Sequence, residues 1–325
     1  MSGPILVSKQ WLLARMYEPD IVIVDCRFDL GRPEAGREDY TSSHIPGAVY
    51  LDLNTDLSAP VQAHGGRHPL PDPDVLAERL GRAGISNGSR VVAYDDQGGM
   101  YASRLWWMLR WLGHDAVHVM EEGFTAWKDA GYPVTDAQQV VVPASFVPEA
   151  RTEMLARMEE VREKLGRPDV LLVDSRDAAR YRGETEPIDA KAGHIPGAMN
   201  QFWKENVDER GAWKPEAQRR EQLAAIVEAL EAGREIIVYC GSGVSACLNV
   251  LALHELGYPQ VRLYAGSWSD WISYEDNPVA TGGENRNPHG TRARGRVVTG
   301  MYQRTCYNPL SIFHPIVCKY PIIKD

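Results

Sequence analysis

The sequence predicts an α/β protein made of two similar domains in tandem, each a small parallel sheet flanked by helices. Three observations lead to this prediction. The chain has 325 residues, more than one hydrophobic core usually organises. Its two halves repeat the same segments in the same order. Within each half, short β-branched runs alternate with helical stretches, as expected when helices cover a parallel sheet.

The internal repeat joins segments that lie about 145 to 150 residues apart. The matching pairs are IVIVDCR (21–27) with VLLVDSR (170–176), HIPGA (44–48) with HIPGA (194–198), and VVAYD (91–95) with IIVYC (236–240). Because the order is kept over so long a stretch, we interpret the chain as a duplicated pair of domains. We place the domains at residues 1–135 and 153–282, joined by a linker at 136–152.

The individual elements follow from the pattern of apolar residues. IVIVD and RVVAYD in the first copy, and VLLVD and EIIVYC in the second, are continuous apolar runs typical of strands buried on both faces. The segments 73–84 and 220–233 show helical periodicity. Ligands of such sheets bind beyond the carboxyl ends of the strands, where Asp95 and Cys240 fall.

The last segment, residues 283–325, differs from both copies. It begins with a polar, basic stretch and ends in closely spaced prolines that disfavour a helix. We expect this tail to be poorly ordered. Cys306 and Cys318 within it are too weak a pattern to predict a metal site.

Composition excludes several classes of function. The chain is 44% apolar and 24% charged, as in ordinary globular proteins, and its net charge of -9 argues against nucleic-acid or anionic-membrane partners. No apolar run is long enough to cross a membrane, and the N-terminus lacks the pattern of a signal peptide. Five cysteines without a pairing pattern suggest a reducing compartment. We therefore expect a cytoplasmic protein.

The strongest chemical signal is the segment that follows the strand EIIVYC. Cys240 opens a loop with two glycines before a helical pattern starts, so its thiol lies in a strand-loop-helix turn. Inward-pointing amides and the start of a helix favour an anion there, and a thiolate is the reactive form of cysteine. The loop residues expected to surround the bound substrate are Gly241, Gly243, Val244, Ser245 and Ala246.

Other candidate residues have plainer interpretations. We interpret Cys26 and Cys247 as packing residues, and the histidines of the two HIPGA segments, His44 and His194, as turn residues whose imidazole ties the loop to an adjacent Asp. HGGRH (64–68) offers no Cys or carboxylate at ligand spacing, so no metal site is predicted. The helical spacing of the indole side chains in SRLWWMLRWLG indicates a core face or domain interface; they are Trp106, Trp107 and Trp111.

The repeat, both HIPGA segments and CGSGVSA (240–246) resemble the tandem-domain rhodanese family over about 280 residues. That family comprises thiosulfate and 3-mercaptopyruvate sulfurtransferases, in which only the C-terminal domain holds the active cysteine. The resemblance implies that Cys240 carries sulfur as a persulfide. It also implies that the N-terminal domain is catalytically inactive, because Asp95 stands at the matching position.

The resemblance implies further catalytic residues. Ser242 would join a histidine and an acidic residue in a relay, with the histidine supplied by HPLP (68–71) as His68 and His64 as its rival. The acidic position aligns with Asn54, although two aspartates, Asp52 and Asp56, lie near it in the sequence.

The donor carboxylate would be bound by two arginines near the second HIPGA. Arg180 matches the first of these positions. The second falls at Ile188, Asp189 or Lys191, so that Arg182 or Lys191 would have to take its place. The loop after Cys240 carries no cation, which in this family is typical of 3-mercaptopyruvate sulfurtransferases rather than thiosulfate-preferring ones.

These residues predict an enzyme that moves sulfur from 3-mercaptopyruvate or thiosulfate to cyanide or to a cellular thiol such as thioredoxin or glutathione. No metal or organic cofactor is expected. The alternatives are a thiosulfate-specific sulfurtransferase and a non-enzymatic persulfide-binding or regulatory module. A cysteine-dependent phosphatase is excluded because it needs an arginine six residues after the cysteine, where Ala246 stands.

Overall fold

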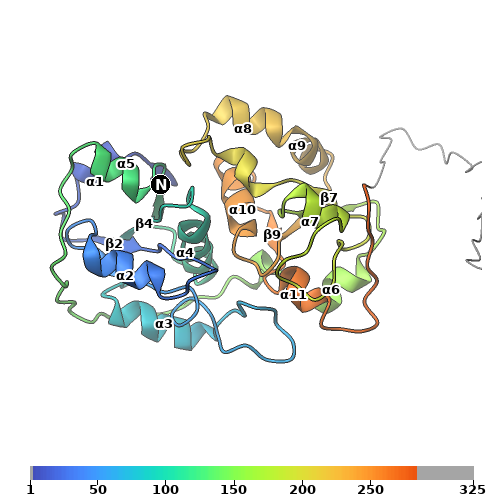
Figure 1. Cartoon of the computed structure of the whole chain (residues 1–325), viewed down its shortest axis with the longest axis horizontal. Coiled ribbons are helices and arrows are strands. Elements are labelled where there is room, and N and C mark those ends of the chain that lie inside the picture. Colours follow the sequence, from blue (N-terminus) through green and yellow to red (C-terminus); the bar gives the residue numbers. More distant parts are fainter. Residues whose placement is uncertain (1–2, 284–325) are drawn as a thin grey trace, which may run out of the picture. The chain divides into compact units, whose positions relative to one another are not determined.

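The computed structural model describes residues 3–283, which contain two parallel sheets, one in each half of the chain (Figure 1). The two-copy α/β architecture predicted from the repeat is therefore confirmed. The expectation of a poorly ordered tail at 283–325 falls, apart from Gly283, outside the described residues, as do Cys306 and Cys318.

The N-terminal sheet has five parallel strands in the order β1-β5-β4-β2-β3. The strands are β1 (Leu6–Val7), β2 (Ile21–Asp25), β3 (Val49–Tyr50), β4 (Arg90–Tyr94) and β5 (Val117–Met120). Alternate residues of the central strands face opposite sides, so both faces need a cover of helices. The helices are α1 (Lys9–Leu13), α2 (Ala35–Ser42), α3 (Pro73–Arg82), α4 (Met100–Trp111) and α5 (Phe124–Asp129).

Two separate clusters of buried side chains show which helices cover which face. Ile23 and Val92 pack with side chains of α1, α2 and α5 on one face of the sheet. Val24 and Val91 pack with side chains of α3 and α4 on the other. The strands are therefore buried on both sides, as their continuous apolar runs predict.

The C-terminal sheet has four parallel strands in the order β7-β6-β8-β9. They are β6 (Val170–Asp174), β7 (Met199–Asn200), β8 (Glu235–Tyr239) and β9 (Arg262–Leu263). Its register repeats that of the first copy, since Asp174 pairs with Tyr239 as Asp25 pairs with Tyr94. Cys240 and Asp95 consequently occupy the same place, one residue beyond a central strand.

Six α-helices and two short 3-10 helices complete the described part of the second copy. Side chains of α6, α7 and α11 pack on one face of the sheet, and those of α9 and α10 on the other. The helices are α6 (Met158–Glu163), α7 (Ala178–Arg182), α8 (Glu216–Gln222), α9 (Ala224–Glu231), α10 (Ala246–Glu255) and α11 (Ser267–Trp271), with 3-10 turns at Thr152–Met154 and Trp203–Asn206.

Helices α4 and α10 pack against each other where the two domains meet (Figure 1). Buried side chains from both helices and both sheets form one continuous apolar cluster. Trp106 and Trp107 of α4 are fully buried in it, and Trp111 nearly so, which confirms their prediction as core or interface residues. Trp106 also makes an edge contact with His254 of α10.

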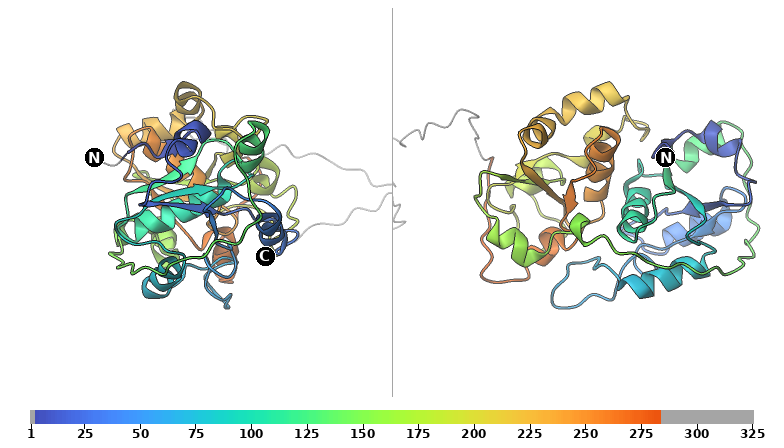
Figure 2. Two further views of the ribbon diagram at one scale, coloured as in Figure 1. Left: turned by 90° about the vertical axis from the view of Figure 1, so that its left-hand side faces the viewer. Right: turned by 180° about the vertical axis from the view of Figure 1, so that it is seen from behind.

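The linker segment 136–152 is extended up to the 3-10 turn at Thr152–Met154 and passes α3 and the end of α4 (Figure 2). The N–H group of Ala144 donates to the carbonyl of Gly81 in α3, and the N–H group of Arg151 donates to the carbonyl of Trp111. These backbone hydrogen bonds attach the segment to the N-terminal domain before the second copy starts.

The two HIPGA turns are built alike. Nδ1 of His44 lies 2.7 Å from the carbonyl oxygen of Tyr40, and Nδ1 of His194 lies 2.7 Å from that of Tyr181. Each imidazole also stacks on the ring of the same tyrosine. A structural role is therefore confirmed, but the expected aspartate partner is wrong, because a tyrosine carbonyl close to each turn takes that place.

Arg104 is a fully buried cation on α4 that ties the two domains together. Its Nη1 donates to the carbonyl of Gly243 at 2.9 Å, and its Nη2 donates to the carbonyl of His68 at 3.1 Å. It thus fixes the position of two loops at once. Within residues 3–283, no helix is both long and apolar enough to traverse a lipid bilayer.

Replacing Arg104 with lysine should destabilise the protein, because a single ammonium cannot serve both carbonyls with the geometry of a guanidinium. We expect the free energy of unfolding to fall by about 1–3 kcal/mol, measured by denaturant titration. Arg110→Lys on the same helix is the matched control, since Arg110 pairs with the half-exposed Asp115. Equal losses for both variants would contradict a special role for Arg104.

Candidate active site

Cys240 follows strand β8 directly and is almost completely buried. Its N–H group donates to Oγ of Ser267 at 3.1 Å, and its carbonyl accepts from the N–H group of Trp268. Ser267 has a φ of 57°, and among residues 3–283 no other non-glycine residue has a positive φ. Strained backbone of this kind is concentrated at functional sites, so the surroundings hold Cys240 in a defined position.

The loop between Cys240 and α10 presents its backbone amides without partners. Within the described part of the chain, no acceptor is found for the N–H groups of residues 241–245, nor for that of Ala246, the first residue of α10. Buried amides without acceptors are rare in proteins, and a curled row of them forms an anion site. The loop is therefore suited to hold a negative group beside the Cys240 sulfur.

The first copy shows this kind of loop with its anion in place. Asp95 stands at the position of Cys240, and its carboxylate accepts four backbone N–H groups at 2.8–3.0 Å; the donors are Gln97, Gly99, Tyr101 and Ala102. Each oxygen accepts two bonds. Burial raises the pKa of this carboxyl, and the four backbone N–H groups oppose that rise. The N-terminal loop is consequently filled by its own side chain and offers no nucleophile.

His68 and Ser242 meet across the domain boundary, with Nδ1 of His68 2.7 Å from Oγ of Ser242. Burial, together with the nearby cations of Arg104 and Arg67, lowers the pKa of His68 to about 3. His68 is therefore a neutral imidazole at physiological pH and can exchange a proton with the serine hydroxyl.

No carboxylate completes this pair among residues 3–283. Asp52 accepts from the N–H groups of Asn54 and Thr55, and Asp56 accepts from the N–H group of Asp52. Both aspartates are thus engaged within their own loop. The structure presents a serine–histidine dyad rather than the three-residue relay that the resemblance implied.

A small cavity of about 60 Å³ opens beside the Cys240 sulfur and is lined by both domains. Gly241, Ser242, Val244 and Ser245 lie in its wall, as predicted from the loop. The remaining lining residues are Leu30, Leu53, Arg67, His68, Met100, Tyr101, Arg180 and Ile188. A donor bound here would contact the nucleophile, the dyad and two arginines.

Gly243 and Ala246 were also predicted to bind substrate, but they are absent from the lining of this cavity. Gly243 has a φ of 74°, and a Cβ atom there would lie only 2.1 Å from the carbonyl oxygen of Ala265. Ala246 is fully buried at the start of α10. Both residues therefore pack against the protein interior and set the course of the loop. Only their backbone N–H groups could contact a bound anion.

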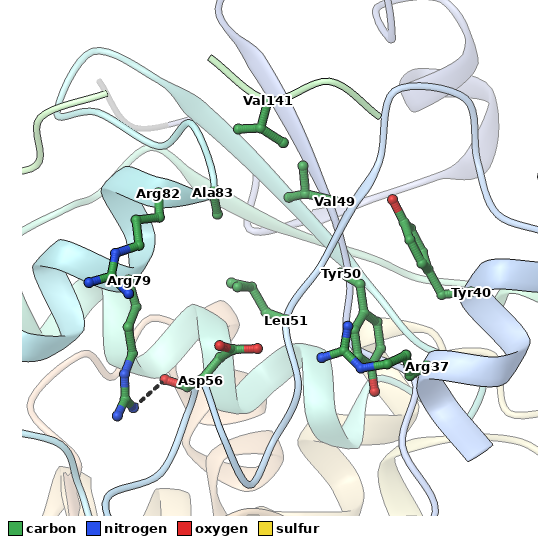
Figure 3. A pocket seen from close by; sticks show the side chains of 10 residues that line it. All are labelled: Arg37, Tyr40, Val49, Tyr50, Leu51, Asp56, Arg79, Arg82, Ala83 and Val141. Carbon is green, nitrogen blue, oxygen red and sulfur yellow. Dashed lines mark hydrogen bonds between the residues drawn. The ribbon is translucent and has the colours of Figure 1, made fainter. Parts of the chain in front are cut away.

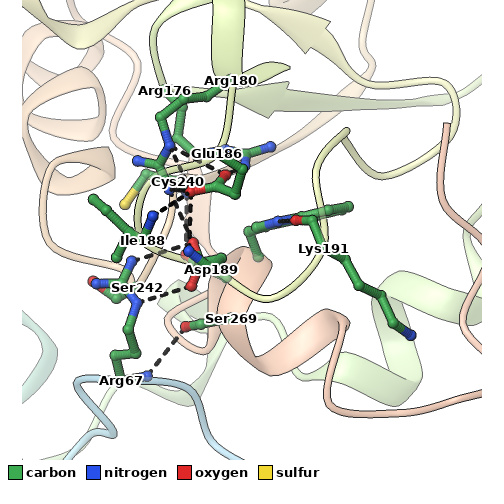
Figure 4. Close-up of polar contacts among 12 residues, drawn as sticks. Arg67, Arg176, Arg180, Glu186, Ile188, Asp189, Lys191, Cys240, Ser242 and Ser269 are labelled. Carbon is green, nitrogen blue, oxygen red and sulfur yellow. Dashed lines mark hydrogen bonds and ion pairs between the residues drawn. The ribbon is translucent and has the colours of Figure 1, made fainter. Parts of the chain in front are cut away.

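Arg180 lines the cavity and is drawn with Cys240 in Figure 4, whereas Arg182 and Lys191 are not among the lining residues. Arg182 pairs with Glu184 on the exposed surface. The side chain of Lys191 points away from Cys240, and its carbonyl accepts from the indole of Trp268. The expectation that Arg182 or Lys191 would bind the donor is therefore corrected, because their positions on the chain direct them outward.

Three side chains of the segment HGGRH contact the second domain. His64 lies 2.8 Å from Oγ of Ser273 and stacks on Tyr274, while His68 contacts Ser242 and Arg67 pairs with Asp189. Within residues 3–283, no group of three or more His, Cys, Asp or Glu side chains could hold a metal ion.

The two other described cysteines are buried and free. Burial raises the pKa of Cys247 to about 12, and its Sγ donates to the carbonyl of Gly243. Burial, with Asp25 and Asp95 nearby, raises the pKa of Cys26 well above its ordinary value. Both are neutral thiols, which agrees with packing roles.

A larger cavity of about 290 Å³ lies in the N-terminal domain and holds no nucleophile (Figure 3). Arg79 borders it but donates to the carbonyls of Asp56 and Ser58, and Arg82 pairs with Glu78. Because no cysteine, serine or histidine lines it, this cavity is a weaker candidate than the one at Cys240.

Comparison with known proteins agrees with this geometry. The family model described as "Rhodanese-like domain" matches residues 8–130 and 157–274, which is once in each copy. The chain belongs to the rhodanese family. Its first match contains the loop at Asp95 and its second the loop at Cys240.

Individual members of the rhodanese family resemble the chain over most of its length. A probable 3-mercaptopyruvate sulfurtransferase of Pseudomonas aeruginosa is 44% identical over 87% of this chain and all of the relative. A putative thiosulfate sulfurtransferase of Mycobacterium tuberculosis is 35% identical over 86% of this chain and 98% of the relative. The solved 3-mercaptopyruvate sulfurtransferase from Leishmania major is 29% identical, with a TM-score of 0.72 over 83% of this chain and 74% of that one.

Two cations at this rhodanese site were missed from the sequence. Arg104 lies in the tryptophan-rich helix, and Arg67 lies in HGGRH, where only the histidines were considered as candidate site residues. Both donate hydrogen bonds to residues of the second domain that lie more than a hundred positions away in the sequence. Arg67 could have been predicted from its position next to His68, because a segment that brings His68 to the loop after Cys240 also brings its neighbour close to that loop.

Asp95→Ala should strongly destabilise the N-terminal domain, because four backbone N–H groups would lose their acceptor. We expect the free energy of unfolding to fall by about 3–5 kcal/mol in denaturant titration. The exposed Asp129→Ala on α5 is the control and should change it little. Comparable values for the two variants would mean that the loop does not need an anion.

His68 should make stability depend on acid pH. Because its pKa falls from the ordinary 6.5 to about 3 on folding, the unfolded chain binds the proton first, and stability decreases as the pH drops between these values. His68→Gln should therefore show a shallower decrease in thermal unfolding temperature from pH 7 to pH 4. The exposed His64→Gln should keep the wild-type slope, and the same slope in both variants would contradict the assignment.

Proposed function

We propose that this rhodanese-family protein is a sulfurtransferase that carries sulfur as a persulfide on Cys240. The observation that supports this most directly is the comparison of the two loops. The amides of the first loop bind the Asp95 carboxylate, whereas the loop after Cys240 leaves its amides free. A persulfide on Cys240 would place a negative terminal sulfur where the first copy has a carboxylate oxygen.

The first half-reaction transfers one sulfur atom to the Cys240 thiolate. With thiosulfate, the thiolate attacks the outer sulfur, the sulfur–sulfur bond of the donor breaks, and sulfite leaves. With 3-mercaptopyruvate, the thiolate attacks the thiol sulfur, the carbon–sulfur bond breaks, and the enolate of pyruvate leaves and takes up a proton. That proton is the one that the thiol sulfur of the donor loses as it becomes the outer persulfide sulfur, and the Ser242–His68 pair, 2.7 Å apart, is placed to relay it to the enolate.

The donor is 3-mercaptopyruvate or thiosulfate. Residues 241–247 carry no cation, and the dyad is useful only for a donor whose leaving group needs a proton, so both features favour 3-mercaptopyruvate. A thiosulfate-specific enzyme is the alternative. A non-enzymatic regulatory module is disfavoured, because the cavity combines a cysteine, a proton-transfer dyad and two arginines.

The second half-reaction passes the outer persulfide sulfur to a thiophilic acceptor, cyanide in the test tube and a thiol such as thioredoxin or glutathione in the cell. No metal or organic cofactor takes part, since the bound sulfur is itself the carried group. We assign the protein to the cytoplasm, where reduced thiols are available. The three described cysteines are all free thiols, which suits such a compartment.

Steady-state kcat/KM for 3-mercaptopyruvate and thiosulfate, with cyanide as acceptor, tests the proposal. We expect turnover of both donors with a preference for 3-mercaptopyruvate. Cys240→Ser should abolish transfer from either donor, and Cys247→Ser should retain it as the matched control. Full transfer by Cys240→Ser would rule out the persulfide, and a preference for thiosulfate would favour the alternative.

A further inference from the structure

Two guanidinium groups, one from each domain, meet beside the nucleophile. Arg67 comes from the loop before α3 and Arg180 from α7, and both line the cavity at Cys240. A Cβ atom on Gly241 would lie 2.7 Å from Nη2 of Arg67 and 3.6 Å from Nη2 of Arg180. Both cations therefore lie directly over the residue that follows Cys240, and glycine there leaves room for them.

The backbone that carries Arg67 is fixed to the second domain. The N–H group of Gly65 donates to Asp270 at 2.7 Å, and that of Arg67 donates to Oγ of Ser269 at 3.1 Å (Figure 4). A Cβ atom on Gly66 would lie 2.5 Å from the carbonyl oxygen of Gly266, so the two loops are in close contact. Arg67 is thus held at the site even though it belongs to the inactive domain.

Asp189 bridges the two guanidinium groups. Its Oδ1 accepts from Nε of Arg67 at 2.9 Å, and its Oδ2 accepts from Nη2 of Arg180 at 2.9 Å. The aspartate side chain is 3% exposed, whereas that of Arg67 is 28% exposed. Arg180 is also paired with the buried Glu186. Two carboxylates therefore already offset the charge of the two cations before any donor binds.

Each guanidinium keeps donors that these carboxylates do not use. Within the described residues, Nη1 of Arg67 and Nη1 of Arg180 make no hydrogen bond, and neither nitrogen is among the buried polar atoms that lack a partner. A guanidinium has five N–H donors in a planar fork, so both can still bind an oxyanion in the cavity.

The resemblance already implies that Arg180 binds the anionic end of the sulfur donor. We propose that Arg67, from the N-terminal domain, supplies the second guanidinium that binds it, and that the charge of Asp189 sets which donor is preferred. This inference rests on the proposed sulfur transfer. Thiosulfate brings two negative charges and 3-mercaptopyruvate brings one, so repulsion by Asp189 opposes thiosulfate more strongly. The two arginines thus provide affinity for either donor, and Asp189 lowers the affinity for thiosulfate more than that for 3-mercaptopyruvate.

Substitutions of Arg67 and of Asp189 should change KM in opposite directions. A merely structural ion pair would not give this result, because loss of either partner would have the same effect. Arg67→Gln should raise KM for both donors by about tenfold or more while changing kcat little, because bonds to the bound anion are lost. Arg67→Lys, which keeps the charge, should lie between Arg67→Gln and wild type. Asp189→Asn should lower KM for thiosulfate by at least about threefold, and by more than KM for 3-mercaptopyruvate.

Arg167 and Asp169 provide matched controls, since they form an exposed ion pair with the same two-point geometry in the same domain. Arg167→Gln and Asp169→Asn should leave KM for both donors unchanged. If Asp189→Asn raises KM for both donors, as Arg67→Gln is expected to do, or if Arg67→Gln leaves KM unchanged, the inference is overturned.

A binding measurement keeps this test separate from the proposed function. In the Cys240→Ser background, thiosulfate binding can be followed by titration calorimetry without any turnover. We expect Arg67→Gln to weaken that binding and Asp189→Asn to strengthen it. Absence of turnover by the wild type would defeat the proposed function alone, whereas unchanged binding in both double variants would defeat the guanidinium pair alone.

Discussion

The structure depends on one arrangement at the end of each central strand, where the loop that follows presents backbone amides able to bind an anion. In the first domain the Asp95 carboxylate accepts four hydrogen bonds from these amides. In the second domain Cys240 stands at the same register, and the amides around it have no partner among residues 3–283. The same backbone arrangement thus has two roles. In the first copy its amides bind the protein's own Asp95, and in the second copy its amides stay available beside Cys240.

The inactive domain is nevertheless part of the site. It supplies His68 to Ser242, Arg67 to the cavity and the buried Arg104 to the carbonyl of Gly243. These contacts are possible because side chains of α4 and α10 belong to one apolar cluster, which joins the two domains. The first copy therefore lacks a nucleophile but supplies six of the 13 residues that line the cavity.

The repeat, the continuous apolar runs and the Gly-flanked cysteine were sufficient to predict the two parallel sheets and the position of Cys240, because strand ends and turns are local features. His68 was assigned through the resemblance, and the structure brings it to Ser242. Arg180 was assigned through the same resemblance, and it lines the cavity. The second cation could not be predicted, because Arg182 and Lys191 are near in sequence but absent from the lining, whereas Arg67 is distant in sequence and reaches the cavity through the packing of the two domains. The lack of a carboxylate beside His68 could not be predicted either. Asp52 and Asp56 are close to the expected position in the sequence, but their carboxylates bind backbone N–H groups of their own loop.

The central claim is that the free amides after strand β8 stabilise a persulfide on Cys240. Intact-protein mass spectrometry after exposure to thiosulfate or 3-mercaptopyruvate, followed by peptide mapping, tests it most directly. The prediction is a mass gain of one sulfur atom, located on Cys240, that disappears on addition of cyanide and is absent from Cys240→Ser. A sulfur adduct on Cys247 instead, or turnover without any adduct on Cys240, would contradict the claim.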